Sequence, residues 1–146
     1  MKKILPFLLV VLILPAMISS CKKDKNEAPQ AEAEKWYFEK IVYEEFDASG
    51  ALVDAETDAD WTASDYLLLQ NDGKFELVQA GDRIAGTYKI QGSALSLTYQ
   101  EGSGTSASVT VTINAIIVEK SSTQFTFYVE ESDATGKLKS TIYLNK

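Results

Sequence analysis

Short runs in which apolar and polar residues alternate dominate the chain from residue 36 onward. Ile84, Gly86, Tyr88 and Ile90 fall on one side of such a run, and the residues between them fall on the other. Successive side chains of a strand point to opposite faces, so this alternation indicates half-buried strands; a sustained 3.6-residue period, which would indicate helices, is missing. We expect eight strands, within residues 36–46, 66–70, 75–78, 84–90, 95–99, 109–118, 125–129 and 138–144.

Turn signals separate these runs. Asn71-Asp72-Gly73 predicts a tight hairpin, because these residue types tolerate the positive φ that such turns need. Asp47-Ala48-Ser49-Gly50 and Asp133-Ala134-Thr135-Gly136 share a second turn chemistry, in which the aspartate accepts hydrogen bonds from its own turn. Residues 54–63 form the one long connection without an apolar strand pattern, and we expect a loop there.

Each predicted strand has one polar face, so the eight strands must bury their other faces together. An all-β, antiparallel, up-and-down eight-stranded barrel achieves this and leaves no exposed sheet edge. The interior of such a barrel is just wide enough for its own side chains or for one small ligand. A two-sheet sandwich built from the same strands is the alternative architecture.

The N-terminal segment has the features of an export signal. Lys2 and Lys3 precede an apolar run over residues 4–18, which is shorter than the ~20 residues that span a bilayer as a helix. The sequence Ile18-Ser19-Ser20-Cys21 then resembles the lipobox of bacterial lipoproteins, in which the cysteine receives the lipid and becomes the mature N-terminus. An ordinary secretory signal, with Cys21 a free thiol, is the alternative. The resemblance implies a palmitate-type acyl anchor, and Lys22 in place of an inner-membrane retention aspartate implies the outer membrane.

The residues after Cys21 are polar. Residues 22–34 contain no large apolar side chain, so they cannot bury surface to offset the entropy of ordering. The expected organisation is therefore a signal peptide over residues 1–20, the lipidated cysteine with a flexible tether over residues 21–34, and a barrel domain over residues 35–146. Several acyl chains anchor a protein to a membrane without a transmembrane segment.

Composition excludes several functions. The 146 residues include no histidine and a single cysteine, so histidine-based nucleophile pairs, histidine zinc sites and intrachain disulfides are excluded. Removal of residues 1–20 would leave 12 basic and 21 acidic residues, a net charge of −9, which makes nucleic acid a poor partner. We expect a protein of the cell envelope that is not an enzyme and needs no cofactor.

A family resemblance supports the barrel. Trp36 at the start of the first strand, the hairpin over residues 71–75, and Gly86-Thr87-Tyr88-Lys89-Ile90 followed by Leu95-Ser96-Leu97 resemble the small lipocalin-like domains of bacterial lipoproteins. The resemblance spans nearly all of residues 35–146. It departs from lipocalins at Glu34, where they have glycine, and in lacking the late-strand arginine that packs on the tryptophan. It implies a barrel that binds an apolar ligand.

The predicted inward positions supply a candidate ligand-binding set. It consists of Trp36, Phe38, Phe75, Tyr88, Leu97, Tyr99, Phe125 and Phe127. These side chains would line a pocket for a small apolar molecule, or they would simply pack against one another in a filled core. In the second case we expect a protein-interaction subunit of an envelope complex, which would dock through an exposed apolar patch at Tyr37, Ile41 and Tyr43 on the outer face of the first strand, or through the acidic loop.

The acidic loop is a weak metal candidate. Asp54, Glu56, Asp58 and Asp60 alternate along it, and clustered carboxylate oxygens are what Ca²⁺ prefers. The spacing does not match an EF-hand, because that motif needs glycine at Ala59 and glutamate at Asp65. We therefore predict a solvated acidic loop and no metal site.

Overall fold

The computed structural model describes residues 33–102 and 108–146, and all of their regular elements are strands. Within these ranges, no helix has the length and apolar character needed to cross a membrane. The predicted signal peptide, Cys21 and residues 22–32 of the predicted tether lie outside the described residues. The strands are β1 (Glu34–Asp47), β2 (Leu52–Asp58), β3 (Tyr66–Leu69), β4 (Lys74–Gln79), β5 (Asp82–Gln91), β6 (Ala94–Glu101), β7 (Val109–Lys120), β8 (Gln124–Ser132) and β9 (Gly136–Asn145).

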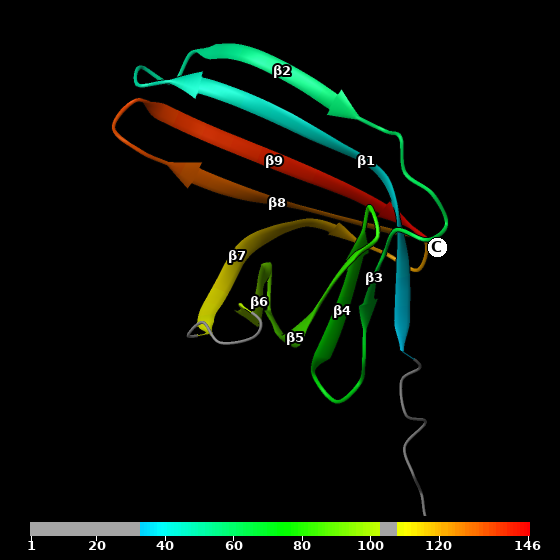
Figure 1. Cartoon of the computed structure of the whole chain (residues 1–146). Coiled ribbons are helices and arrows are strands. Elements are labelled where there is room, and N and C mark those ends of the chain that lie inside the picture. The colour runs from blue at the N-terminus through cyan, green and yellow to red at the C-terminus, as the bar shows by residue number, and fades with distance from the viewer. Residues whose placement is uncertain (1–32, 103–107) are drawn as a thin grey trace, which may run out of the picture.

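Eight of these strands form a closed antiparallel barrel (Figure 1). Strands β3 to β9 pair in chain order, and β1 closes the ring by pairing with both β3 and β9. The predicted barrel is therefore confirmed, and the two-sheet alternative is excluded because a single hydrogen-bonded ring joins all eight strands. The ninth strand, β2, pairs with β1 alone and stands outside the ring.

The first strand has two halves with different partners. Glu34 to Tyr37 pair with β3, whereas Ile41 to Phe46 pair with β2, and a register shift between Phe38 and Lys40 separates the two halves. Such a bulge adds one residue to the strand and reverses which side chains face inward.

Because of the bulge, the prediction of an apolar patch on the outer face of the first strand is wrong for two of its three residues. Ile41 pairs directly with Ile142 in the core and is only 5% exposed, and Tyr43 packs against the same core. Of the three residues expected outside, Tyr37 alone keeps an outer position, beside Tyr66. The alternation of the first strand does not reveal the inserted residue, because Glu39 and Lys40 are both charged.

The prediction that residues 54–63 form a loop is wrong for residues 54–58, which belong to strand β2. In this strand Glu56 pairs with Tyr43 and Asp58 pairs with Ile41, so the connection without a strand is confined to residues 59–65. The acidic residues do alternate with the period of a strand. No apolar face accompanies them, because almost every residue of β2 is exposed.

One end of the barrel interior is packed with large side chains, and we call it the filled end. Trp36 and Phe125 are fully buried, with ring centroids 5.5 Å apart. The Nζ atoms of Lys146 and Lys120 lie 4.4 Å and 5.9 Å from the centroid of the Trp36 ring, so two cations lie close to the tryptophan. The other large side chains that are at most 2% exposed are Phe75, Leu67, Leu69, Leu95 and Leu144.

The predicted turns are confirmed. Gly73 has a φ of 80° in the hairpin between β3 and β4, and Asp72 accepts a hydrogen bond from the Lys74 amide. The Oδ1 atom of Asp47 accepts from Ser49 and Ala51, and that of Asp133 accepts from Thr135 and Gly136. These last two turns lie side by side at the far end of β1 and β9, where residues 47 and 136 pair.

Gly86 is required by close packing rather than by a turn. Phe75 pairs with it across the barrel wall, and a Cβ atom built on Gly86 would lie 2.0 Å from the Thr98 carbonyl oxygen and 2.9 Å from the Phe75 ring. An aromatic ring over a strand glycine shields the backbone and fixes the register.

We therefore predict that Gly86→Ala lowers the free energy of unfolding by about 1–3 kcal/mol, because the added methyl group overpacks the wall. Thr87→Ala, on the exposed outer face of the same strand, should change it by less than about 0.5 kcal/mol. Urea unfolding of both variants measures the difference. Equal stability of the two would show that the wall relaxes around the methyl group.

Candidate functional site

The predicted ligand-binding residues all lie on the inner face, but they belong to two environments. Trp36, Phe75, Leu97, Phe125 and Phe127 are buried, each with 6% exposure or less, and they fill the barrel toward its filled end. Phe38, Tyr88 and Tyr99 are partly buried and pack against that core. The hydroxyl of Tyr88 donates a hydrogen bond to the Gln70 carbonyl at the filled end, 3.1 Å away.

The opposite end of the barrel is open. Strand β7 pairs with β8 only through Ile116 to Lys120, and β8 pairs with β7 only through Phe125 to Tyr128. Beyond these positions the two strands diverge (Figure 1), so residues 109–115 of β7 and 129–132 of β8 have no partner among the described residues on the sides that face each other. We call the gap between these two segments the opening.

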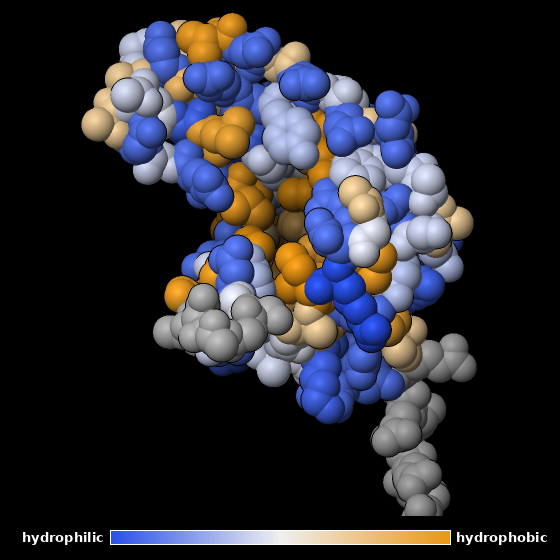
Figure 2. Space-filling view, in the orientation of Figure 1, coloured by the Kyte–Doolittle hydropathy of each residue, from blue (hydrophilic) through white to orange (hydrophobic). Residues whose placement is uncertain are grey.

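The opening leads into a hollow with apolar walls. Figure 2 shows hydrophobic side chains gathered inside the hollow, between an upper lobe that contains β1, β2, β8 and β9 and a lower lobe that contains β3 to β7. The registers place six partly buried apolar or aromatic residues on the inner face of the barrel, and all six pack against the core: Tyr43, Leu77, Ile84, Tyr99, Ile113 and Val129.

Sequence reasoning identified only Tyr99 among these six as part of the candidate ligand-binding set. Tyr43 was assigned to the outer face because the bulge in β1 was not visible in the pattern. Ile84 falls on one side of the alternating pattern, but no sequence signal marks it or Ile113 as lining an opening rather than a packed core. The opening results from the divergence of β7 and β8, which depends on the whole barrel.

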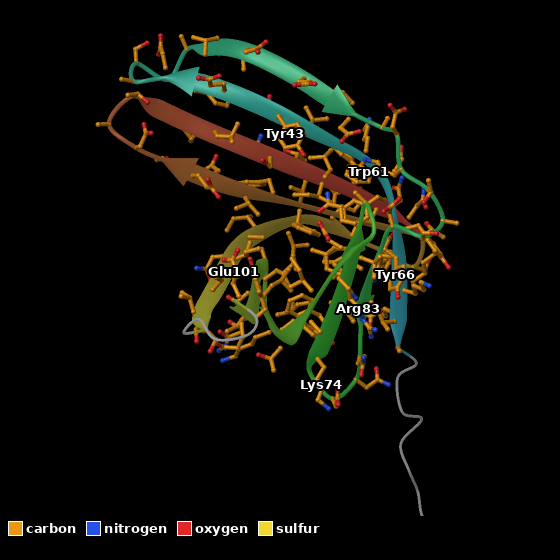
Figure 3. All side chains as sticks on the ribbon, in the orientation of Figure 1. Tyr43, Trp61, Tyr66, Lys74, Arg83 and Glu101 are labelled. Atoms are coloured by element: carbon orange, nitrogen blue, oxygen red, sulfur yellow. The ribbon has the colours of Figure 1, made fainter. Side chains whose placement is uncertain are left out.

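Carboxylates surround the hollow on its upper side. Asp54, Glu56 and Asp58 pair with Glu45, Tyr43 and Ile41, so the three acids of β2 share the inner face of β1. Burial raises the pKa of Tyr43 above its ordinary value, and the nearby charges of Asp58 and Glu56 raise it further. Tyr43 and Glu101 lie on opposite sides of the opening in Figure 3.

The acids continue toward the tip of the upper lobe. Glu131 pairs with Leu138 on the inner face of β8 and β9, and Glu45 pairs with Leu138 from the other side. A hollow of about 640 Å³ lies there, with Val53, which is 56% exposed, among its lining residues. The tip therefore combines exposed apolar surface with carboxylates, and Lys137, which also lines this hollow, forms an ion pair with Glu130.

Asp60, the fourth residue of the predicted acidic loop, lies in the connection after β2, where its amide donates to Asp58. Among residues 33–102 and 108–146 no group of three or more histidine, cysteine or acidic side chains is arranged to hold a metal ion. The acids of β2 are spread along one face of an extended strand, and this spacing separates their oxygens.

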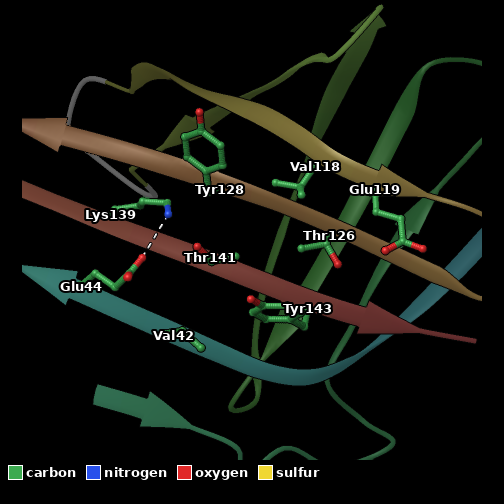
Figure 4. Close-up of a pocket in the computed structure, with 9 residues that line it drawn as sticks. All are labelled: Val42, Glu44, Val118, Glu119, Thr126, Tyr128, Lys139, Thr141 and Tyr143. Carbon is green, nitrogen blue, oxygen red and sulfur yellow. Dashed lines mark hydrogen bonds and ion pairs between the residues drawn. The ribbon is translucent and has the colours of Figure 1, made fainter. Parts of the chain in front are cut away.

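A separate hollow, of about 390 Å³, lies on the outer face of the barrel (Figure 4). Tyr128 and Tyr143 border it, and Lys139 forms an ion pair with Glu44 across it, with an Nζ to Oε2 distance of 3.1 Å. Val118, at its rim, is 63% exposed. This surface is shallow and crossed by an ion pair, in contrast to the apolar hollow inside the barrel.

The shifted pKa values of several aspartates have structural causes. The pKa values of Asp47, Asp72 and Asp133 are lowered by hydrogen bonds that each carboxylate accepts from residues of its own turn. The pKa of Glu76 is lowered by hydrogen bonds from Tyr66 and then from Arg83 on the outer face, and the same bond raises the pKa of Tyr66. Local hydrogen bonding accounts for each of these shifts.

Asp65 fastens the loop before β3 to the barrel. Its Oδ2 atom accepts hydrogen bonds from the amide and hydroxyl of Thr62, and its Oδ1 atom accepts from the Ala80 amide at 2.7 Å. Ala80 has a φ of 51°, which is unfavourable for a residue with a side chain, so this bond stabilises a strained turn between β4 and β5. The loop also carries Trp61, whose ring centroid lies 5.1 Å from that of Phe38.

The comparisons with known proteins leave the family open. No protein-family model matches the chain, and no curated protein or solved structure matches it either.

We predict that Asp65→Asn lowers the midpoint of thermal unfolding by several degrees at neutral pH, because the amide is a weaker acceptor than the carboxylate. The hydrogen bonds lower the pKa of Asp65 below its ordinary value of 3.8. The stability that the carboxylate contributes is therefore present above pH 3.8 and is lost as the pH falls through the lowered folded-state pKa.

Thermal unfolding of the wild type and the variant from neutral pH to below pH 3.8 tests this link between the protonation of Asp65 and stability. The difference between the two midpoints should shrink as the pH falls. Asp60→Asn, an exposed position in the same loop, is the matched control and should leave the midpoint unchanged. A difference that stays constant with pH would show that the carboxylate charge of Asp65 is not the stabilising feature.

Proposed function

We propose that this chain is a lipid-anchored, non-enzymatic binding protein that holds a small apolar ligand in the hollow of the barrel. The observation that carries the proposal is the opening between β7 and β8, which exposes an apolar interior in an otherwise closed barrel. A concave apolar site with a few polar groups at its rim is the usual form of a small-molecule site.

The lining suits a ligand with one polar end. The hollow ends at the filled end of the barrel, because Trp36, Phe75 and Phe125 are packed there. The phenol groups of Tyr43 and Tyr99 lie on the inner face nearer the opening, where they could hydrogen-bond a polar group of the ligand.

The proposal that the protein is not an enzyme is supported by its chemistry. The chain has no histidine, the residue most often used as a general acid or base. The lowered pKa values of its aspartates are explained by turn hydrogen bonds, so these shifts do not indicate a catalytic carboxylate pair.

The anchor is proposed from the sequence. Ile18-Ser19-Ser20-Cys21 matches a lipobox, and a lipid on Cys21 would attach the barrel to the outer membrane through the polar residues that follow.

A protein-interaction role in an envelope complex is the second candidate function. The unpaired backbone of residues 109–115 and 129–132 favours it, since a free strand edge is a ready template for pairing with another chain.

For ligand binding, we predict that Val129→Trp abolishes complex formation with 1-dodecanol, because the larger side chain fills the hollow. Val118→Trp makes the same change on the exposed outer surface and should bind as the wild type does. Native mass spectrometry of the purified full-length chain detects the one-to-one complex. Loss of binding in both variants, or in neither, would place the ligand elsewhere.

For the anchor, we predict that Cys21→Ser abolishes incorporation of radiolabelled palmitate and releases the protein from the membrane fraction. Wild-type protein expressed under the same conditions is the reference. Persistent labelling of the variant would exclude Cys21 as the lipidated residue.

A further inference from the structure

The two free edges at the opening offer backbone hydrogen bonds to a partner. Within residues 33–102 and 108–146, residues 129–132 of β8 pair with β9 on one side only, and residues 109–115 of β7 pair with β6 on one side only. Most of these residues are exposed, so water now solvates the amide and carbonyl groups along both edges. An extended chain laid along β8 would replace that water with the ladder hydrogen bonds of a further strand.

The side chains beside the β8 edge specify what such a strand would carry. Val129 faces the hollow and is partly buried, Glu130 faces outward, and Glu131 faces inward at the rim. Side chains of an added strand would lie directly beside these residues, because neighbouring strands are only about 5 Å apart. The complementary strand therefore has an apolar residue beside Val129 and a basic residue beside Glu131, whereas Glu130 already forms an ion pair with Lys137, with an Nζ to Oε1 distance of 3.0 Å.

The charged residues on the inner face around the opening are all acidic, and Lys137, which lines the hollow at the tip, is paired with Glu130. Glu45, Asp54, Glu56, Asp58 and Glu131 lie on the inner face of the upper lobe, and Glu101 lies on the inner face across the opening. Within residues 33–102 and 108–146, the registers place no lysine or arginine on the inner face at this open end. An incoming basic segment would meet attraction from both lobes.

We propose that the opening binds an extended polypeptide segment that adds as a strand to the free edge of β8, with inward side chains that are apolar beside the hollow and basic toward the rim. This inference rests on the proposed function, in that the hollow is the binding site, and it names a different class of occupant. The segment would insert its apolar side chains into the hollow and present its basic side chains to the carboxylates at the rim.

A second copy of this chain does not fit that description. Its free edges carry the sequences Val109 to Ala115, Val129 to Ser132 and Leu52 to Asp58, and none of them contains a lysine or arginine. Pairing of two β2 or two β8 edges would bring carboxylates of like charge together, which is destabilising.

The test uses a fluorescently labelled peptide of alternating valine and threonine with a lysine near each end. Binding to the full-length chain is followed by anisotropy in nanodiscs of phosphatidylcholine, which carry no net charge. The control peptide has the same side chains with alternate amides N-methylated along one edge, so that it keeps charge and apolarity but cannot form the ladder. We expect the unmodified peptide to bind and the N-methylated peptide to lose at least about ten-fold in affinity.

Protein variants locate the site. Glu131→Lys should weaken binding of the unmodified peptide by about ten-fold or more, because it places a repulsive charge beside the strand. Glu119→Lys makes the same charge change on the outer face, beside Thr126, and should leave the affinity unchanged. Glu131→Gln, which removes the charge without adding another, should give an intermediate loss, and circular dichroism confirms that each variant keeps the fold.

The outcomes separate the two proposals. Equal binding of the N-methylated peptide, or equal weakening by Glu131→Lys and Glu119→Lys, would overturn strand addition whether or not 1-dodecanol binds. No peptide binding with intact 1-dodecanol binding would overturn this inference and leave the proposed small-molecule function standing. Failure of both probes would overturn both.

Discussion

The structure depends on the ability of one strand to pair on both sides along its length. β1 must hydrogen-bond β9 over most of its 14 residues while its other edge passes from β3 to β2. The bulge between Phe38 and Lys40 lies at that change of partner, and bulges bend a strand and increase its twist. Without this pairing the ring from β3 to β9 would be an open sheet with two free edges.

The same arrangement leaves the barrel unequal at its two ends. At the filled end every strand of the ring meets its neighbours, and the largest side chains are buried there. At the other end β1, β8 and β9 continue with β2 as an upper lobe, while β7 stays with the lower lobe, so the wall separates between β7 and β8. Carboxylates on the inner face oppose unwanted edge pairing, and they also favour a basic partner.

The closed barrel could be predicted from the sequence because alternation fixes strands and turn residues fix their connections. The turns at Asn71 and at Asp47 and Asp133 follow from local side-chain chemistry, which is why they are confirmed in detail. The inward position of Tyr43 could not be predicted, since it depends on a bulge among charged residues. The opening could not be predicted either, because the pairing of β7 with β8 is decided by twist and length across the whole ring.

Both ends of the described chain meet at the filled end, since β1 begins at Glu34 and β9 ends at Asn145. A lipid on Cys21 would therefore tether the barrel to the membrane from its filled end. Lys146 and the ion pair of Lys120 with Glu34 lie at the filled end, whereas carboxylates surround the opening, so an anionic membrane surface would repel the opening within a Debye length of about 8 Å and turn the filled end toward the membrane. A ligand would then reach the hollow from the aqueous side rather than from the bilayer. That route suits a segment of a soluble or envelope protein at least as well as it suits a lipid.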